Sequence, residues 1–378
     1  MYDEIRPFND EEASAALRRV STNPGIKKIS QYLFPEQDPD LMVHLLANIK
    51  SVDQFQNDVM SVIVKAVTKK STQGVTYDGL DYFNKDVKGN VPKYVLLSNH
   101  RDIVLDAAFI QVIFYDNGLP LTEIAVGDNL VQNPFFEDLI RSNRMIKVTR
   151  SLNPREVYTT SKNLSEYIRM RITESANSIW LAQRQGRAKD GNDYTEQGLL
   201  KMLAMSGTGD FVKDFTEVRI MPMAISYELE SCDILKAIEL ERRAHMKTTY
   251  VKAPNEDYNS MLTGICQQKG RVHVEFCKPI TFDELRGCAD LDHNQRFQRL
   301  SAIVDDRIHQ GYKLYPNNYI ALDMLKGNNE HCDKYYPWEK EQYRQYMETQ
   351  LQKVPEGVDR DDVKKIFLEI YANPVLNR

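Results

Sequence analysis

The sequence contains no long apolar run and no excess of positive charge. No uninterrupted apolar segment approaches the roughly 20 residues that a membrane-spanning helix needs, so any contact with a membrane is expected to be peripheral. The net charge of −5 at pH 7 argues against a nucleic-acid-binding protein, because such a protein would present a basic surface. The segment Met1–Glu4 is acidic and no apolar signal-peptide core follows it, which predicts a cytoplasmic location at the inner face of a membrane.

Metal-binding and nucleotide-binding motifs are missing as well. The cysteines are an odd number, lie far apart and form no Cys-x-x-Cys pair, which argues against a zinc site and against a disulfide framework. No Gly-x-Ser-x-Gly, Gly-x-Gly-x-x-Gly or Walker loop occurs. We therefore expect no metal site and a reducing compartment. The cysteines are Cys232, Cys266, Cys277, Cys288 and Cys332.

In the middle of the chain, short apolar runs alternate with longer segments of helical periodicity. This alternation is typical of a mostly parallel β-sheet with helices on both faces. The predicted strands are Tyr94–Leu97, Leu121–Val126, Met145–Val148, Ser178–Ala182, Val218–Ser226 and Val272–Phe276. The predicted helices between them are Leu105–Asp116, Phe135–Arg141, Arg155–Ile172, Glu196–Met205 and Ile234–His245.

The flanking regions lack this alternation of short apolar runs and helical segments. Residues 1–75 and 286–378 are expected to be helical additions to an α/β domain over residues 76–285. Asn9 precedes three acidic residues and is expected to cap the first helix. The segment Asp292–Gln310 has the periodicity of an amphipathic surface helix.

A histidine follows the first predicted strand. His100 stands just after an apolar run, and two carboxylates, Asp102 and Asp106, follow within a few residues. Open α/β sheets present their chemistry at the carboxyl ends of strands, and imidazole is well suited to take up a proton near neutral pH. Arg101 beside it favours an anionic substrate. A purely structural His100 at a strand end is the alternative interpretation.

A second predicted strand ends in a basic loop with two glycines. Arg184, Arg187 and Lys189 place three cations within six positions, and Gly186 and Gly191 allow the backbone to turn tightly. Guanidinium groups bind phosphate in a fork. If this loop lies in the same sheet as His100, it indicates a phosphorylated substrate, and otherwise it is a solvated basic turn.

Two further segments carry little chemistry by themselves. Arg150 ends the strand that begins at Met145, and a solvent-facing strand terminus would explain it equally well. Pro222 interrupts the apolar run Val218–Ser226, and a proline is expected at the start of a strand or at a sheet edge. His273 lies in an alternating strand and is expected to be structural.

In this order, the four segments resemble the glycerolipid acyltransferase family, which includes 1-acylglycerol-3-phosphate acyltransferases. The family pattern is His-x4-Asp, an arginine at a strand end, Glu-Gly-Thr-Arg-Ser-Arg, and an apolar strand with a proline. The resemblance covers about residues 80–285. The matching segments are His100 to Asp106, Ile146–Arg150, Gln185–Lys189 and Met221–Ile225.

The resemblance implies that His100 is the general base and that Asp106 orients it. Five residues separate the two here, where the family has four. The aspartate must still reach the imidazole, so this insertion requires a local bulge, or Asp102 as the partner instead. We favour Asp106, because the apolar run that follows it matches the start of the family's helix.

The resemblance also implies that Arg187, together with Lys189 and Arg150, binds the phosphate of a lysophosphatidate-like acceptor. Gln185 and Gly186 belong to the same substrate-binding loop. Gln185 stands where the family has glutamate, so it keeps a hydrogen-bond acceptor but loses the charge. This departure admits a different lipid hydroxyl as acceptor, such as that of an N-acyl amino acid lipid.

The implied reaction needs no cofactor, because the acyl donor is already an activated thioester on coenzyme A or on acyl carrier protein. The acceptor lies in a membrane, so a peripheral membrane surface is an expected partner. Phe135 and Phe136 either dip into that surface or pack as an ordinary core. A domain of this fold that binds lipid or a partner without turnover is the non-catalytic alternative.

Overall fold

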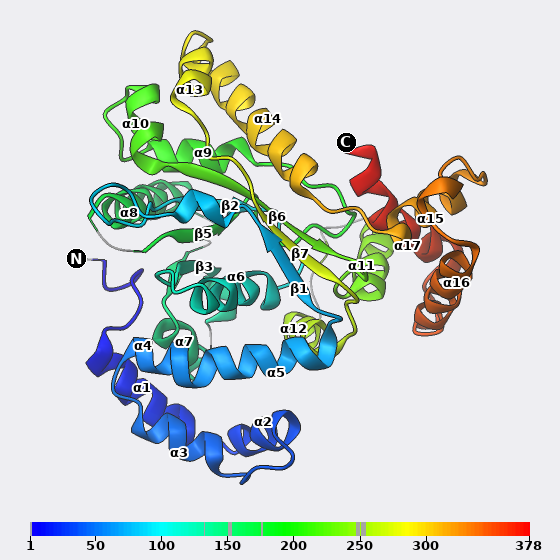
Figure 1. Cartoon of the computed structure of the whole chain (residues 1–378), viewed down its shortest axis with the longest axis horizontal. Helices are drawn as coiled ribbons and strands as arrows, with labels where there is room; N and C mark the ends of the chain where they lie inside the picture. The colour runs from blue at the N-terminus through cyan, green and yellow to red at the C-terminus, as the bar shows by residue number, and fades with distance from the viewer. Residues whose placement is uncertain (1, 132, 150–152, 175–176, 247–249, 251–254) are drawn as a thin grey trace.

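The computed structural model describes residues 2–131, 133–149, 153–174, 177–246, 250 and 255–378. Its centre is a seven-stranded sheet in the order β1-β7-β6-β2-β5-β3-β4, with helices on both faces (Figure 1). Neighbouring strands are parallel except for β6 and β7, which are antiparallel. The predicted mostly parallel α/β fold is thereby confirmed. The strands are β1 Val75–Asp78, β2 Val95–Ser98, β3 Glu123–Gly127, β4 Met145–Val148, β5 Ile179–Ala182, β6 Ile220–Tyr227 and β7 Val272–Phe276.

The central strands are buried on both faces, as parallel strands covered by helices must be. On one face, Val95 and Leu97 of β2 pack in a core built with α8, α9, α10, α13 and α14. On the other face, Leu96 packs in a core with α5 and α6. The helices around the sheet are α6 Leu105–Asp116, α7 Pro134–Ser142, α8 Pro154–Glu174, α9 Gln197–Ala204, α10 Phe211–Val218, α11 Asp233–His245, α12 Glu256–Cys266, α13 Phe282–Ala289 and α14 His293–Gly311.

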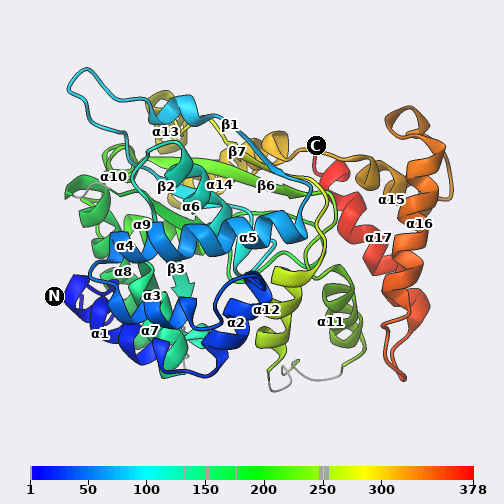
Figure 2. The same ribbon diagram turned by 60° about the horizontal axis from the view of Figure 1, so that its bottom comes forward.

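The N-terminal helices pack together with α7 at one corner of the molecule (Figures 1 and 2). The Asn9 side chain accepts the N–H of Glu12, and the Glu12 side chain accepts the N–H of Asn9, so the predicted helix cap is confirmed. The elements are α1 Asp10–Ser21, α2 Gly25–Leu33, α3 Leu41–Asn48, α4 Val52–Gln54, the π-helical turn η1 Phe55–Met60 and α5 Ser61–Ser71.

The C-terminal helices stand beside the sheet and share a separate core with α11 (Figure 2). These helices are α15 Pro316–Lys326, α16 Pro337–Leu351 and α17 Arg360–Leu376. In contrast, α14 packs against the sheet, because Leu300 and Val304 lie in the same core as Val95 and Leu97 of β2. The expected boundary at residue 285 therefore falls before a helix that is part of the α/β core. Short 3-10 turns occupy Leu80–Phe83, Asp128–Leu130 and Cys332–Lys334.

Two sequence expectations differ from the structure. The edge strand β1 was not predicted, because its four residues are mostly exposed and show no apolar run. Pro222 lies inside β6 between β2 and β7, so the expectation of a strand start or sheet edge is wrong. The last residue of β7, Phe276, pairs with Met223, so the proline lies beyond the end of the β7 ladder. Its carbonyl still accepts the N–H of Cys277.

Candidate active site

His100 and Asp106 face each other across the loop that joins β2 to α6. Nδ1 of His100 lies 2.8 Å from Oδ2 of Asp106, which is fully buried, whereas the imidazole is 15% exposed. The ring of Trp180 on β5 packs edge-on against the imidazole, with centroids 5.5 Å apart. Because a carboxylate can only accept, Nδ1 carries the proton and the lone pair of Nε2 stays available to a substrate.

The Asp106 carboxylate is held by three donors besides His100. The backbone N–H groups of Arg101 and Asp102 reach Oδ2 at 2.6 and 3.0 Å, and the Tyr227 hydroxyl reaches Oδ1 at 2.6 Å. Burial alone would raise the pKa of Asp106, but the hydrogen bonds from His100, Tyr227 and the backbone hold this pKa below its ordinary value. Asp106 is therefore a carboxylate at neutral pH and stabilises a protonated His100.

The turn before α6 takes up the additional residue between His100 and Asp106. Asp102 Oδ1 accepts the backbone N–H groups of Val104 and Leu105, both at 2.8 Å, and its Oδ2 accepts the hydroxyl of Ser231. Asp102, the competing carboxylate, is thus committed to shaping this turn. The second residue of α6, Asp106, is the one that contacts the imidazole.

Arg101 does not supply a cation to the substrate, so that expectation is wrong. Its guanidinium is fully buried, 2.5 Å from Asp193 and 3.4 Å from Glu230, and it also donates to the carbonyl of Gly191 at 3.2 Å. Lys236 completes the cluster with a 2.6 Å ion pair to Glu230. The side chain is buried beside the ring of Tyr312, where two carboxylates compensate its charge.

The basic loop after β5 lies against the loop that carries His100. β5 and β2 are neighbours in the sheet, and the N–H of Ala188 donates to the carbonyl of His100 at 2.8 Å. The Gln185 side chain is exposed. Gly186 has a φ of +77° and an open surrounding, with no atom within 4 Å of the position a Cβ would take. The structure thus brings the predicted base and the predicted substrate-binding loop together.

The three cations of this loop have different partners. Arg184 stacks on the ring of Tyr194 at 4.2 Å and donates to a backbone carbonyl, and Lys189 forms an ion pair with Glu239 on α11. Arg187 is different: within the described part of the chain it forms no ion pair, and its buried Nη1 has no hydrogen-bond partner. Arg187 is therefore the guanidinium of this loop for which the described residues provide no carboxylate partner.

Arg150 lies outside the described residues, so the structure gives no account of its position. The strand that precedes it, β4, is the edge strand three places from β2 in the sheet. At about 4.8 Å per strand, this separates the β2 and β4 strands by roughly 14 Å.

The C-terminal helix α17 supports the basic loop from behind, which the sequence did not reveal. Gly191 has a φ of +79°, and a Cβ added to it would lie 2.2 Å from the carbonyl oxygen of Ile370. The Asn373 side chain donates to the carbonyl of Asp190 at 2.6 Å. The loop therefore ends against a helix of the C-terminal region, and a second glycine in a basic loop was the only sequence signal of this contact.

An apolar pocket of about 110 Å³ opens between α5 and α6, beside the turn that carries Asp106. Its walls include Val64 and Val67 of α5, together with Leu105 and Ala108 of α6. A larger groove, of about 1,240 Å³, runs along the N-terminal segment, β4 and α8, and it contains neither His100 nor Arg187. Of these two cavities, the apolar pocket is the one that adjoins the His100 loop.

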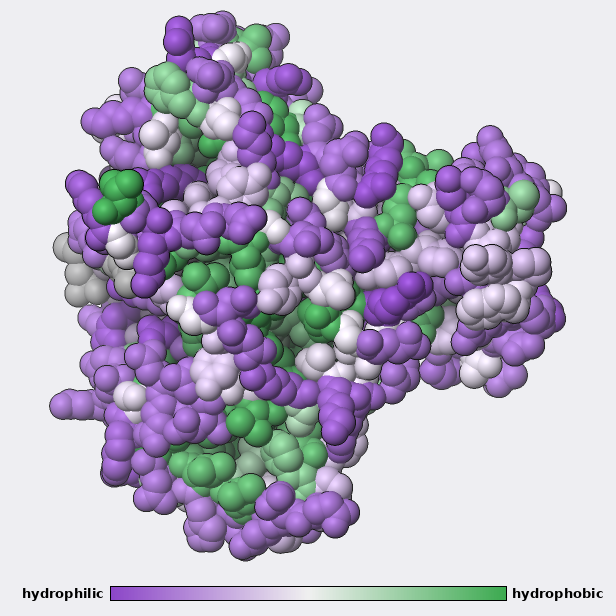
Figure 3. Space-filling view, viewed as in Figure 1, coloured by the Kyte–Doolittle hydropathy of each residue, from purple (hydrophilic) through white to green (hydrophobic). Residues whose placement is uncertain are grey.

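None of the helices in the described residues combines the length and the apolar character needed to cross a membrane. Apolar side chains nevertheless gather on the surface over α2 and α3 (Figure 3). Ile29 and Tyr32 of α2 and Leu45 of α3 are exposed by 41, 52 and 37%. By contrast, Phe135 and Leu139 of α7 are partly buried and pack against the core of the N-terminal helices.

Comparison with known proteins gives one family match, over part of the chain. Residues 75–226 match the model of the acyltransferase family, and this segment includes His100, Asp106 and the whole basic loop. Comparison with curated protein sequences gives no match. The chain is similar to the crystal structure of the 1-acyl-sn-glycerophosphate (LPA) acyltransferase PlsC from Thermotoga maritima, at 11% identity and a TM-score of 0.40. The similarity covers 80% of this chain and 94% of that one.

Proposed function

We propose that the protein, whose residues 75–226 match the model of the acyltransferase family, transfers a fatty acyl group from a thioester donor to the hydroxyl of a lysophosphatidate-like glycerolipid. One observation carries this proposal. The loop of Arg187, a guanidinium with no ion pair to any described residue, is hydrogen-bonded to the backbone of His100, whose imidazole is already paired with Asp106. A base and an anion-binding group at the same edge of the sheet suit a substrate that carries both a hydroxyl and a phosphate.

His100 begins the proposed reaction as a general base. Nε2 takes the proton of the acceptor hydroxyl while the oxygen attacks the carbonyl carbon of the thioester. The carbon–sulfur bond then breaks, and the protonated imidazole returns its proton to the departing thiolate. Asp106 stabilises the imidazolium between these steps. General acid–base catalysis of this kind contributes typically about 10²- to 10⁴-fold in rate.

Arg187 is proposed to bind the phosphate of the acceptor. A guanidinium binds phosphate through two parallel hydrogen bonds, and the Arg187 side chain is only partly buried and has no carboxylate partner among the described residues. Gln185 and Gly186 at the exposed turn leave room for the headgroup. In this proposal Lys189 fixes the loop to Glu239 of α11, and Arg150 is a second cation for the acceptor.

The lipid chains require apolar surfaces near this site. The pocket between α5 and α6 adjoins the Asp106 turn, and we propose that it receives part of the acyl chain of the donor, acyl-CoA or acyl carrier protein. The exposed face of Ile29, Tyr32 and Leu45 is the proposed contact with the inner face of the membrane. The partly buried Phe135 then belongs to the packing of α7 rather than to the membrane contact.

The test is an acyl-transfer assay with labelled acyl-CoA or acyl carrier protein and a panel of acceptors. Transfer to lysophosphatidate that is lost in His100→Ala supports the proposal. Transfer to an N-acyl amino acid lipid alone would favour the second candidate acceptor, which Gln185 motivates. No transfer to any acceptor, together with lipid binding by the folded protein, would establish the non-catalytic alternative, against which the 2.8 Å contact between His100 and Asp106 weighs.

A further inference from the structure

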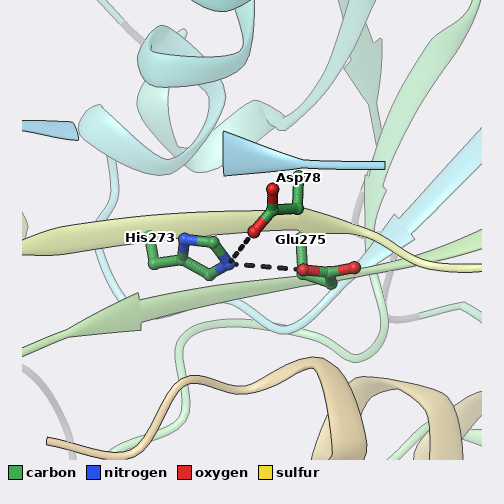
Figure 4. A group of neighbouring side chains, drawn as sticks. All are labelled: Asp78, His273 and Glu275. Atoms are coloured by element: carbon green, nitrogen blue, oxygen red, sulfur yellow. Dashed lines mark hydrogen bonds and ion pairs between the residues drawn. The ribbon is translucent and has the colours of Figure 1, made fainter. Parts of the chain in front are cut away.

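Three potential metal ligands from β1 and β7 converge away from the active site. His273 and Glu275 alternate along β7 with Val272 and Val274, which face the core beneath α5 and α6. The two polar residues therefore project from the opposite face of the sheet. Asp78, at the end of β1, is the register partner of Glu275. Figure 4 shows both carboxylates directed at the imidazole of His273, with their contacts drawn as dashed lines.

The hydrogen bond at Nδ1 of His273 bears on whether Nε2, which faces the carboxylates, carries a lone pair. The Thr76 hydroxyl donates to the carbonyl of Val272 at 3.3 Å and lies 2.9 Å from Nδ1 of His273. When the hydroxyl accepts from Nδ1–H, the lone pair of the imidazole lies on Nε2, on the side of the two carboxylates. In this arrangement a metal ion can bind among the three groups.

The distances in the cluster suit a metal ion. Nε2 of His273 lies 3.3 Å from Oε2 of Glu275 and 3.8 Å from Oδ2 of Asp78, and all three ligand atoms lie within 4.8 Å of one another. Ligands at the usual zinc distances of about 2.0–2.1 Å are separated by about 3.3 Å in a tetrahedron. Neutral imidazole and two carboxylates carry a total charge of −2, which one divalent cation neutralises.

The backbone around the ligands is held in place. His273 is 4% exposed, and Gly79, directly after Asp78, packs so tightly that an added Cβ would lie 2.0 Å from the carbonyl oxygen of Phe276. The contact fixes the end of β1 against β7, although the Asp78 side chain itself is exposed. A buried imidazole whose far nitrogen is oriented by a hydrogen bond, beside accessible carboxylates, is the arrangement typical of protein metal ligands.

We propose that His273, Asp78 and Glu275 form a divalent-cation site, with zinc as the preferred ion, which ties the edge strand β1 to β7. The imidazole nitrogen favours zinc over magnesium, which prefers an all-oxygen environment. Three protein ligands leave one coordination position for water. Asp78 is far from His273 and Glu275 in the chain, so no spacing motif in the sequence indicates this site.

The experiment is isothermal titration of zinc chloride into the untagged full-length protein after removal of metals with EDTA. We expect about one zinc ion per chain at this site and a higher midpoint of thermal unfolding in the zinc-loaded protein. Replacing zinc with cobalt should give the visible absorption of a four- or five-coordinate ion. Magnesium at the same concentration should produce no such shift.

Variants locate the ion. His273→Gln and Glu275→Gln should each lower the zinc affinity by at least about tenfold, and Thr76→Val, which removes the partner of Nδ1, by about 10- to 100-fold. The matched control is His245→Gln. His245 also lies near two carboxylates, but Glu241 faces its Nδ1 and Asp362 its Nε2, so the three groups do not converge on one ion.

The result that overturns the proposal is a wild-type protein whose zinc affinity and thermal midpoint match those of folded Glu275→Gln. Glu275→Gln is the decisive variant if His273→Gln does not fold, because the Glu275 side chain is 29% exposed and glutamine has nearly the same shape.

Discussion

The backbone N–H of Ala188 donates a 2.8 Å hydrogen bond to the carbonyl oxygen of His100. This bond joins the loop after β5 to the loop after β2, beyond the paired part of the two strands. It brings the loop of Arg187 against the loop of His100, although the two segments are far apart in the chain. The placement of these two loops at the same edge of the sheet therefore follows from the strand order.

Replacing His100 should abolish acyl transfer and leave the fold intact. The side chain is partly exposed and makes one polar side-chain contact, to Asp106, so His100→Ala should change the free energy of unfolding by no more than about 1–2 kcal/mol. Steady-state acyl transfer and urea unfolding measure the two effects separately. Wild-type turnover in this variant would show that another group acts as the base.

Asp106→Asn should lower kcat more than it changes the KM for the acceptor. The amide cannot stabilise the imidazolium, and its NH2 group would oppose the donors that now surround the carboxylate. We expect kcat to fall by about 10²-fold or more and stability to fall by about 1–3 kcal/mol.

The control for Asp106 is Asp102→Asn, whose residue shapes the turn and does not contact the imidazole. Its effect on stability should exceed its effect on kcat, when the two variants are compared at equal fractions of folded protein. Equal losses of kcat in both variants would mean that Asp102 and Asp106 contribute alike to catalysis.

Arg187→Ala should raise the KM for a phosphorylated acceptor by about 10- to 100-fold, the effect of losing charge-assisted hydrogen bonds worth about 1.5–3 kcal/mol. The KM for the acyl donor should change little. Arg184→Ala, in the same loop, is the matched control, because this guanidinium is already stacked on Tyr194. If Arg184→Ala raises the acceptor KM as much as Arg187→Ala does, the effect is one of net charge and not of a specific contact.

Much of the sheet could be predicted because its strands are short apolar runs buried on both faces. Met145–Val148 and Val272–Phe276 coincide with β4 and β7, and Leu105–Asp116 coincides with α6. The edge strand β1 could not be found in this way, since it is mostly exposed and depends on β7 for its hydrogen bonds. Local pattern identifies buried elements, whereas an edge strand is defined by its partner.

In the candidate site, too, the sequence pattern indicates local features but not contacts between distant residues. His100 and the basic loop were recognised from their positions after strands, and the structure brings them together. Arg101 was misjudged, because the partners that bury it, Asp193 and Glu230, are distant in the chain. The support of the loop by Ile370 was invisible for the same reason. Tertiary contacts decide which cation is free for a substrate, and spacing along the chain does not contain them.

Gly191→Ala should destabilise the protein more than Gly186→Ala. Both glycines have φ near +80°, where any other residue costs about 1 kcal/mol. A Cβ at Gly191 would also collide with the carbonyl oxygen of Ile370, whereas a Cβ at Gly186 meets no atom within 4 Å. The difference in urea unfolding isolates the contact with α17, and we expect it to be about 1–3 kcal/mol. Similar losses in both variants would show that α17 shifts to accommodate the added Cβ with no loss in the free energy of unfolding.

Asp305 on α14 should make the free energy of unfolding depend on pH. Burial raises the pKa of this carboxyl to about 6, although the Thr195 hydroxyl donates to it at 2.6 Å. The pKa is higher in the folded chain than in the unfolded chain, so the stabilisation from protonated Asp305 is fully present below about pH 4. It is lost as the pH rises through 6.

Between pH 5 and pH 7.5 the wild type should lose about 1 kcal/mol more stability than Asp305→Asn, after allowance for partial exposure. Asparagine keeps the acceptor oxygen for Thr195, so urea unfolding of both proteins at the two pH values measures the titration alone. Equal losses in the two proteins would assign the pH dependence to other groups.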